Sequence, residues 1–222
     1  MPFSTSQRLV AATFFLAVAY GPTAHAQDLD SQAARRFTLQ VHYGANGNFF
    51  TSTQVTEGPR EFVRTHFLGT AGGGAVAYRL TPASALSLEY TRSVNSRPVR
   101  FVQLVGPTNT PIVSDLRIRY LNNAFQAVYE RSLSRSGHWK AHAGLLYLTT
   151  ASQSVQLGSP VVVSEINRRN SYSEEAGVVA GLEYSRPIDT RLRLGLKVRG
   201  YYLATVSTFE MLTLTPTLSY QL

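Results

Sequence analysis

The sequence predicts an all-β protein, an eight-stranded antiparallel up-and-down transmembrane β-barrel that follows a cleaved signal peptide. Three observations support this prediction. Apolar and polar residues alternate with period two almost to the end of the chain, which is typical of strands with two different faces. The connections between these segments are short and long in turn. Aromatic residues collect near both ends of the segments, as they do at the two interfaces of a bilayer.

The start of the chain predicts a secretory signal peptide over residues 1–26. Residues 9–20 form an apolar run that is too short to span a bilayer as a helix, and Ala24-His25-Ala26 is a small-x-small cleavage signature. An uncleaved buried helix is the alternative. Cleavage after Ala26 would leave 196 of the 222 residues, divided into a mobile start over 27–35 and a barrel over 36–222.

The absence of cysteine narrows the class of protein. An exported chain without disulfides is typical of a bacterial envelope, and neither lipoprotein anchoring nor a cysteine-based metal or redox site is available to it. No run of 18 or more apolar residues occurs, so the route into a membrane would be a closed barrel. We therefore predict the bacterial outer membrane as the location.

Eight segments alternate in this way, and the last one is the clearest. From Leu212 to Leu222 every second residue is apolar or proline, and the residues between them are uncharged and polar. The predicted strands lie near 36–49, 66–80, 86–94, 116–132, 139–150, 173–185, 190–203 and 212–222. Short turns join them at 81–85, 134–137 and 186–189, and longer loops are expected near 50–65, 95–115 and 151–172, with a shorter one near 204–208. This rhythm is typical of outer-membrane barrels.

Alternation does not say which face meets lipid, because a soluble lipocalin-like barrel has the same period with its apolar face inside. The aromatic residues favour the membrane. Trp139 and Tyr147 lie on one strand, eight residues apart. In a barrel whose strands are tilted by about 40°, they would be separated by roughly 20 Å along the barrel axis. A soluble core has little reason to sort aromatic residues to its two ends.

The polar face then points inward, and its charges come in pairs across the short turns. We predict that Arg79 lies opposite or diagonal to Glu89, Glu130 to Lys140, and Glu183 to Arg193, with Lys197 on the same face. Such pairs would fill a narrow lumen as a salt-bridged plug, because unpaired buried charge is costly. A proton or ion path is the functional alternative.

The chain resembles the small outer-membrane β-barrel family, the OmpX-like and PorT-like group, over essentially its whole mature length. The resemblance rests on the cleavage region, on AGVVAGLEYSR (176–186), on YLNNAFQAVYERSL (120–133) and on the final LTPTLSYQL. It implies folding by the barrel-assembly machinery, which reads the last strand. The family usually ends in an aromatic residue, whereas this chain ends in Leu222 with Tyr220 two positions earlier.

Candidate chemistry is sparse. His42 and His142 fall on the inward face, but no carboxylate cluster accompanies them at metal-ligand spacing. The glycines at 72–74 lack the lysine and helix of a phosphate-binding loop. The basic residues are dispersed and the chain is exported, which argues against nucleic-acid binding. The sequence therefore predicts no catalytic residue, no metal and no cofactor.

Arginines are frequent in the long loops and at their rim. Guanidinium groups bind phosphates in a bidentate manner, so Arg117, Arg119, Arg168 and Arg169 are candidate contacts for lipopolysaccharide. Ordinary solvated loop charge is the alternative. The expected partners are thus outer-membrane lipid and lipopolysaccharide, with room for an unidentified envelope protein.

Two classes of function remain open. The first is a non-enzymatic barrel that serves envelope integrity, surface interaction or a secretion apparatus. The second is a lipid-modifying enzyme, a lipid A deacylase or acyltransferase. A soluble periplasmic carrier of the lipocalin type would need the reversed arrangement of faces.

Overall fold

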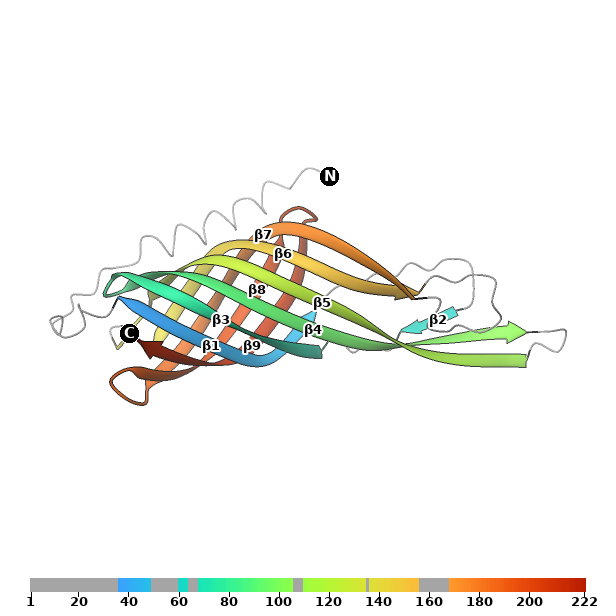
Figure 1. Ribbon diagram of the computed structural model, residues 1–222, viewed down its shortest axis with the longest axis horizontal. Helices are drawn as coiled ribbons and strands as arrows, with labels where there is room; N and C mark the ends of the chain where they lie inside the picture. The colour runs from blue at the N-terminus through green and yellow to red at the C-terminus, as the bar shows by residue number, and fades with distance from the viewer. Residues whose placement is uncertain (1–35, 49–59, 64–67, 106–109, 135, 156–167) are drawn as a thin grey trace.

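The computed structural model is a closed β-barrel from which one long hairpin projects (Figure 1). It describes residues 36–48, 60–63, 68–105, 110–134, 136–155 and 168–222. The described strands are β1 (Phe37–Asn48), β2 (Arg60–Val63), β3 (Leu68–Thr81), β4 (Ser84–Val105), β5 (Thr110–Ser132), β6 (Trp139–Val155), β7 (Arg168–Pro187), β8 (Leu192–Leu203) and β9 (Thr208–Gln221). All pairings between them are antiparallel.

Eight of these strands form the ring. Each strand from β3 to β9 lies beside its neighbours in sequence, β1 pairs with both β3 and β9, and the pairing of β4 with β5 completes the circle. The short strand β2 pairs only with β4 and stands outside the ring. The predicted eight-stranded up-and-down barrel is therefore confirmed, and closure satisfies the strand edges without a helix.

The polar face of each strand points into the barrel. On β9, Thr213, Thr215 and Thr217 are each 2% exposed, whereas Leu212 and Leu214 on the other face are more than 40% exposed. The exterior of the other strands is also apolar, with Leu88 and Leu145 each 67% exposed. A soluble carrier barrel has the opposite arrangement, with its apolar face inside. An apolar exterior around a polar interior is the arrangement of a membrane barrel.

Aromatic side chains on the exterior form contacts at both ends of the barrel. Near the short turns, Trp139 stacks against Tyr184 with ring centroids 5.1 Å apart, and Phe37 lies 5.2 Å from Tyr78. Nearer the long loops, Tyr90 lies 5.1 Å from Phe125. These two levels are the positions that the headgroup regions of a bilayer favour.

The short-turn end carries further polar contacts. Arg191, in the turn between β7 and β8, donates a hydrogen bond to the Tyr220 hydroxyl at 3.2 Å. This bond raises the pKa of Arg191. In the turn before β6, Gly137 has a φ of 66°, which glycine adopts without steric cost.

Two expectations about the loops are wrong. We predicted a loop over 95–115, but β4 and β5 continue through most of it and are separated only by residues 106–109. The expected loop over 50–65 contains β2. The alternation of the polar and apolar residues fades in both segments, so a pattern search ends the strands too early, while backbone pairing between neighbours continues them.

Several expectations concern residues outside the described part of the chain. These are the signal peptide over 1–26 and the mobile start over 27–35. No helix among the described residues is long and apolar enough to cross a membrane.

Candidate functional site

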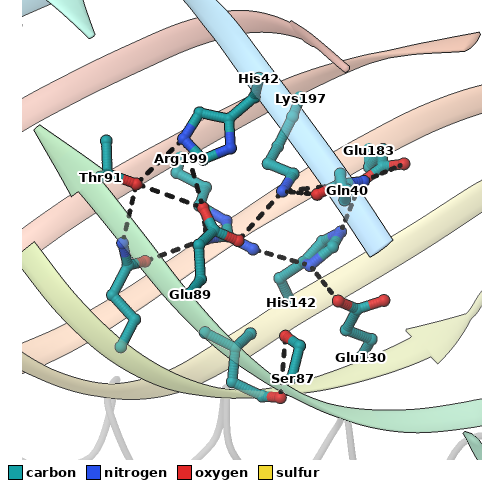
Figure 2. Close-up of polar contacts among 12 residues, drawn as sticks. Gln40, His42, Ser87, Glu89, Thr91, Glu130, His142, Glu183, Lys197 and Arg199 are labelled. Carbon is teal, nitrogen blue, oxygen red and sulfur yellow. Dashed lines mark hydrogen bonds and ion pairs between the residues drawn. The ribbon is translucent and has the colours of Figure 1, made fainter. Parts of the chain in front are cut away.

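The barrel interior contains a set of charged side chains that we call the ionic cluster. It comprises three carboxylates and three cations, which come from five strands and contact one another: Glu89, Glu130, Glu183, Lys140, Lys197 and Arg199. Inward alternation places them in the lumen, and the ring brings together strands that are distant in sequence (Figure 2). Lys197, Arg199 and Glu183 are each 1% exposed.

Glu89 lies at the centre of the ionic cluster. One of its oxygens lies 2.6 Å from Nη1 of Arg199, and the other accepts a hydrogen bond of 3.1 Å from Nζ of Lys197. Lys197 also donates to Oε1 of Gln40 and lies 3.9 Å from Glu183. Charge-assisted hydrogen bonds of this kind are the strong ones, and they offset part of the desolvation cost of the buried ions.

His142 connects the two sides of the ionic cluster. Nη2 of Arg199 lies 3.2 Å from Nδ1 of His142. Because arginine can only donate, Nδ1 accepts, and the ring proton is on Nε2 in the neutral form. That nitrogen lies 3.6 Å from Glu183. On the other side, Nδ1 of His142 lies 4.0 Å from Glu130. Glu130 in turn lies 3.8 Å from Nζ of Lys140. The side chain of His142 therefore sits between two carboxylates and a guanidinium group, fully buried.

His42 lies on the opposite side of Glu89, and its geometry is not that of a catalytic relay. Its Nε2 lies 3.1 Å from the Thr91 hydroxyl and 3.7 Å from Glu89. A nucleophile–His–carboxylate relay uses the two ring nitrogens for the two partners, whereas here one nitrogen faces both. Thr91 is 2% exposed, so its hydroxyl does not face solvent. His42 and Thr91 therefore pack inside the lumen and hydrogen-bond to each other there.

The register corrects two of the three predicted charge pairs. Glu89 lies opposite Ala75 and Arg79 opposite Ala85, four positions away, so the predicted pairing of Arg79 with Glu89 is wrong. Likewise, Glu183 lies opposite Lys197 and Arg193 opposite Pro187. The predicted pairs assumed hairpins centred near residues 84 and 188, whereas the observed registers are centred near residues 82 and 190. The actual partners of Glu89 come from β8 across the lumen, whereas Glu183 has Lys197 opposite it on the neighbouring strand.

The third pair is brought together. Ser132 lies opposite Lys140 and Glu130 opposite His142, so Glu130 and Lys140 are one diagonal step apart. Arg193 instead donates to the carbonyl of Gly137 at 3.0 Å. Arg199, Gln40 and Gln126 were not among the predicted lumen contacts, although all three follow the inward alternation of their strands. That alternation is the signal that could have found them.

The four candidate lipopolysaccharide arginines lie on β5 and β7, the two strands that flank β6, at the long-loop end. Arg117 and Arg119 are exposed on β5, and Arg169 is exposed at the start of β7. Between these strands lies the end of β6, where Ser154 pairs with Arg169 and Gln153 accepts a hydrogen bond from the backbone of Arg119. Arg168 begins β7, but its side chain lies outside the described part.

Metal and cofactor binding find no conventional ligand set here. Among the described residues, no group of three or more histidine, cysteine, aspartate or glutamate side chains could hold a metal ion. The ionic cluster instead matches each carboxylate with a cation of the chain itself.

Comparison with solved structures identifies the same fold elsewhere. The chain is similar to the crystal structure of Ail, the attachment invasion locus protein of Yersinia pestis, with a TM-score of 0.51, 7% identity, and coverage of 85% of this chain and 99% of that one. It also aligns with Neisserial surface protein A (TM-score 0.44, 14% identity, 84% and 97% coverage) and with OprG of Pseudomonas aeruginosa (TM-score 0.42, 8% identity, 84% and 94% coverage).

No protein-family model and no curated protein matches the sequence. The predicted resemblance to the OmpX-like or PorT-like group is therefore supported only as far as the fold. The similarity to Ail establishes the architecture alone. The chain therefore has the eight-stranded β-barrel fold that small outer-membrane proteins adopt, with an apolar exterior.

Proposed function

We propose that this protein is a non-enzymatic outer-membrane protein in which a plugged barrel anchors a projecting hairpin that makes surface contacts. We expect the orientation that is usual for outer-membrane barrels, in which the short turns face the periplasm and the long-loop end faces the medium. The projecting hairpin consists of residues 96–105 of β4 and 110–119 of β5. One observation carries the proposal: this hairpin continues far beyond the ring.

The ladders measure the projection. The pairing of β3 with β4 ends at Gly69 and Asn95, and that of β5 with β6 ends at Tyr120 and Ser152. The β4–β5 ladder continues to Val105 and Thr110. Ten residues per strand at about 3.3 Å each give a projection of roughly 33 Å, which Figure 1 shows as the extended arm beside β2.

An arm of this kind suits contact with another macromolecule. In the described ladders, residues 110–119 of β5 pair with β4 on one side only. Unpaired backbone donors and acceptors along such an edge can bind an extended segment of a partner. The expected partner is an unidentified envelope or surface protein.

The ionic cluster supports the anchor role. Eight strands leave an interior just wide enough for side chains, and here those side chains are bonded across the lumen from β4, β6, β7 and β8. Opening a path for solutes would break several charge-assisted bonds at once. A static barrel that conducts little is the expected behaviour in planar bilayers.

A complementation experiment separates surface contact from envelope integrity. Residues 99–116 are replaced by an Asn-Gly turn, which joins Pro98 to its ladder partner Arg117 and keeps Arg117 and Arg119 in place. In a strain lacking the gene, we expect this clipped variant to restore detergent resistance as well as the full chain does, but not to restore surface attachment. Attachment that is unaffected by the clipping would contradict the hairpin's role.

Lipid contact is a second part of the proposal. We expect Arg117, Arg119, Arg168 and Arg169 to bind lipopolysaccharide phosphates at the outer rim. Replacing all four with Gln should reduce the lipopolysaccharide that copurifies with the barrel. Replacing Arg186 and Arg191, at the short-turn end, is the matched control and should leave that amount unchanged.

The non-enzymatic assignment is tested on the lipid itself. Mass spectrometry of lipid A from cells with and without the gene should give identical acyl patterns. A missing or added acyl chain would favour the deacylase or acyltransferase alternative instead. Recognition of the last strand by the barrel-assembly machinery stays a prediction.

A further inference from the structure

A β-bulge turns one carboxylate into the barrel near its long-loop end. The ladder between β8 and β9 pairs Tyr201 with Met211 and Tyr202 with Phe209, so that Glu210 is the extra residue on β9. Strict alternation from Thr213 and Met211 would point Glu210 at lipid. Because of the bulge, Glu210 and Met211 both lie inside, at 0% and 1% exposure, while Phe209 is 44% exposed.

Among the described residues, no cationic side chain accompanies this carboxylate. The side chains that face Glu210 are the amides of Asn48 on β1 and Asn122 on β5. In the part of the chain that the structure describes, no lysine, arginine or histidine contacts it, and the charged side chain that acts on it is a second carboxylate, Glu175 on β7. A buried carboxylate whose only charged neighbour is another carboxylate is electrostatically unfavourable.

The polar atoms around Glu210 are left without ordinary hydrogen bonds. Neither of its oxygens has a partner in hydrogen-bonding geometry, and the same holds for both polar atoms of Asn122, which is 1% exposed. The amide oxygen of Asn46, two residues before Asn48 on the same inward face, is also unpartnered. A buried polar group that is left unsatisfied destabilises the folded chain.

We infer that Glu210, with the amide oxygens of Asn122 and Asn48, binds a hard cation of the calcium class; we call these three residues the Glu210 site. Carboxylate and amide oxygens are the ligands that such cations prefer, and a bound cation would satisfy the oxygens of Glu210 and Asn122, which have no hydrogen-bond partner. Asn46 and Glu175 would lie around this site as further oxygen donors. Binding would tie β1, β5 and β9 together at the end of the barrel from which the hairpin projects.

Terbium luminescence offers a direct test on the full-length mature protein, folded in detergent and stripped of metal with a chelator. Tb³⁺ replaces Ca²⁺ at oxygen sites, and excitation of a nearby tyrosine sensitises its emission. Tyr201, 1% exposed and paired with Met211 next to Glu210, is the expected donor. We expect saturable emission that Ca²⁺ displaces, with a calcium affinity of about 10⁻⁴–10⁻³ M, as in other sites of low charge.

Two variants assign the binding to this site. Glu210→Gln keeps the shape of the side chain but removes its charge, and should weaken Tb³⁺ binding at least tenfold. Glu174→Gln is the matched control, because it makes the same change on the exposed side chain that accepts a hydrogen bond from Tyr147. Its binding should equal that of the wild type. Equal binding by the wild type and Glu210→Gln, or no saturable binding by the wild type, overturns the proposal.

Thermal unfolding provides a second readout. A ligand that binds only the folded state raises the unfolding temperature, so Ca²⁺ should raise it for the wild type and for Glu174→Gln but not for Glu210→Gln. If Glu210→Gln does not reach the heat-modifiable folded form, Asn122→Ala takes its place, and we expect it to weaken Tb³⁺ binding. Wild-type affinity in a folded Asn122→Ala variant would overturn the proposed ligand set.

Discussion

Buried carboxylates occur in two regions of this lumen, in opposite surroundings. In the ionic cluster, Glu89, Glu130 and Glu183 each lie within 4.0 Å of a lysine or arginine side chain. At the long-loop end, Glu210 is equally buried but faces asparagine amides. In the ionic cluster the chain supplies a cation for each carboxylate. At the Glu210 site no cation among the described residues does so, and we propose a bound metal ion in that role. Burial alone therefore does not distinguish a structural carboxylate from a ligand-binding one. The presence or absence of a cationic side chain beside it is what distinguishes the two.

The largest expected effect comes from breaking the ionic cluster at Arg199. Arg199→Leu removes the partner of Glu89 at 2.6 Å and the donors to Gln126 and His142. Leaving a buried charge uncompensated costs about 3–5 kcal/mol of the free energy of unfolding. Urea unfolding of the detergent-folded barrel measures this loss. Arg191→Leu, at an exposed turn, is the control and should cost less than about 1 kcal/mol. Equal losses for the two variants would mean that the ionic cluster does not hold the barrel.

The next effect is the coupling between Glu89 and Lys197. Their atoms lie 3.1 Å apart and both side chains are 1% exposed, so the pair should behave as a unit. We expect Glu89→Gln and Lys197→Gln each to destabilise the barrel, with a double variant that loses less than the sum of the two, by about 1–3 kcal/mol. A double-mutant cycle in urea unfolding measures this difference. Strict additivity would show that the contact contributes nothing specific.

A smaller effect tests how tightly the wall fits the ionic cluster. A Cβ at Gly73 would collide with the backbone carbonyl of Tyr90 and lie 3.0 Å from Nε2 of His42. Gly73→Ala should therefore cost about 1–3 kcal/mol through overpacking. Gly47→Ala is the matched control, because a Cβ there meets nothing within 4 Å. If both variants unfold at the same urea concentration, the close approach at Gly73 is not limiting.

The smallest expected effect has the opposite sign. In metal-free buffer, Glu210→Gln removes an unpaired buried charge, so we expect it to raise the free energy of unfolding by about 1 kcal/mol. The same substitution at Glu89 should lower it. Parallel urea titrations of the two variants compare the regions directly. Loss of stability in both variants would mean that Glu210 is held by the chain much as Glu89 is.

The alternation in the sequence was sufficient to predict the ring, the number of its strands and which face of each strand points inward. It also placed Glu89, Glu130, Glu183 and Lys197 in the lumen. These features are local, because the direction of a side chain in a strand depends only on its position in a period of two. The projecting hairpin was missed because alternation is weak there and only pairing between the strands defines it.

The partners of the charges were decided by the tertiary structure. Glu89 binds Lys197 and Arg199, more than a hundred residues away, because ring closure brings β4 and β8 across a narrow lumen from each other. Glu210 faces inward only because a bulge adds one residue to β9, and a single added residue reverses the side chain's direction. The sequence by itself thus determined the barrel and its faces, since both follow from a period of two. Register, closure and one bulge decided the contacts, because those depend on where distant strands meet.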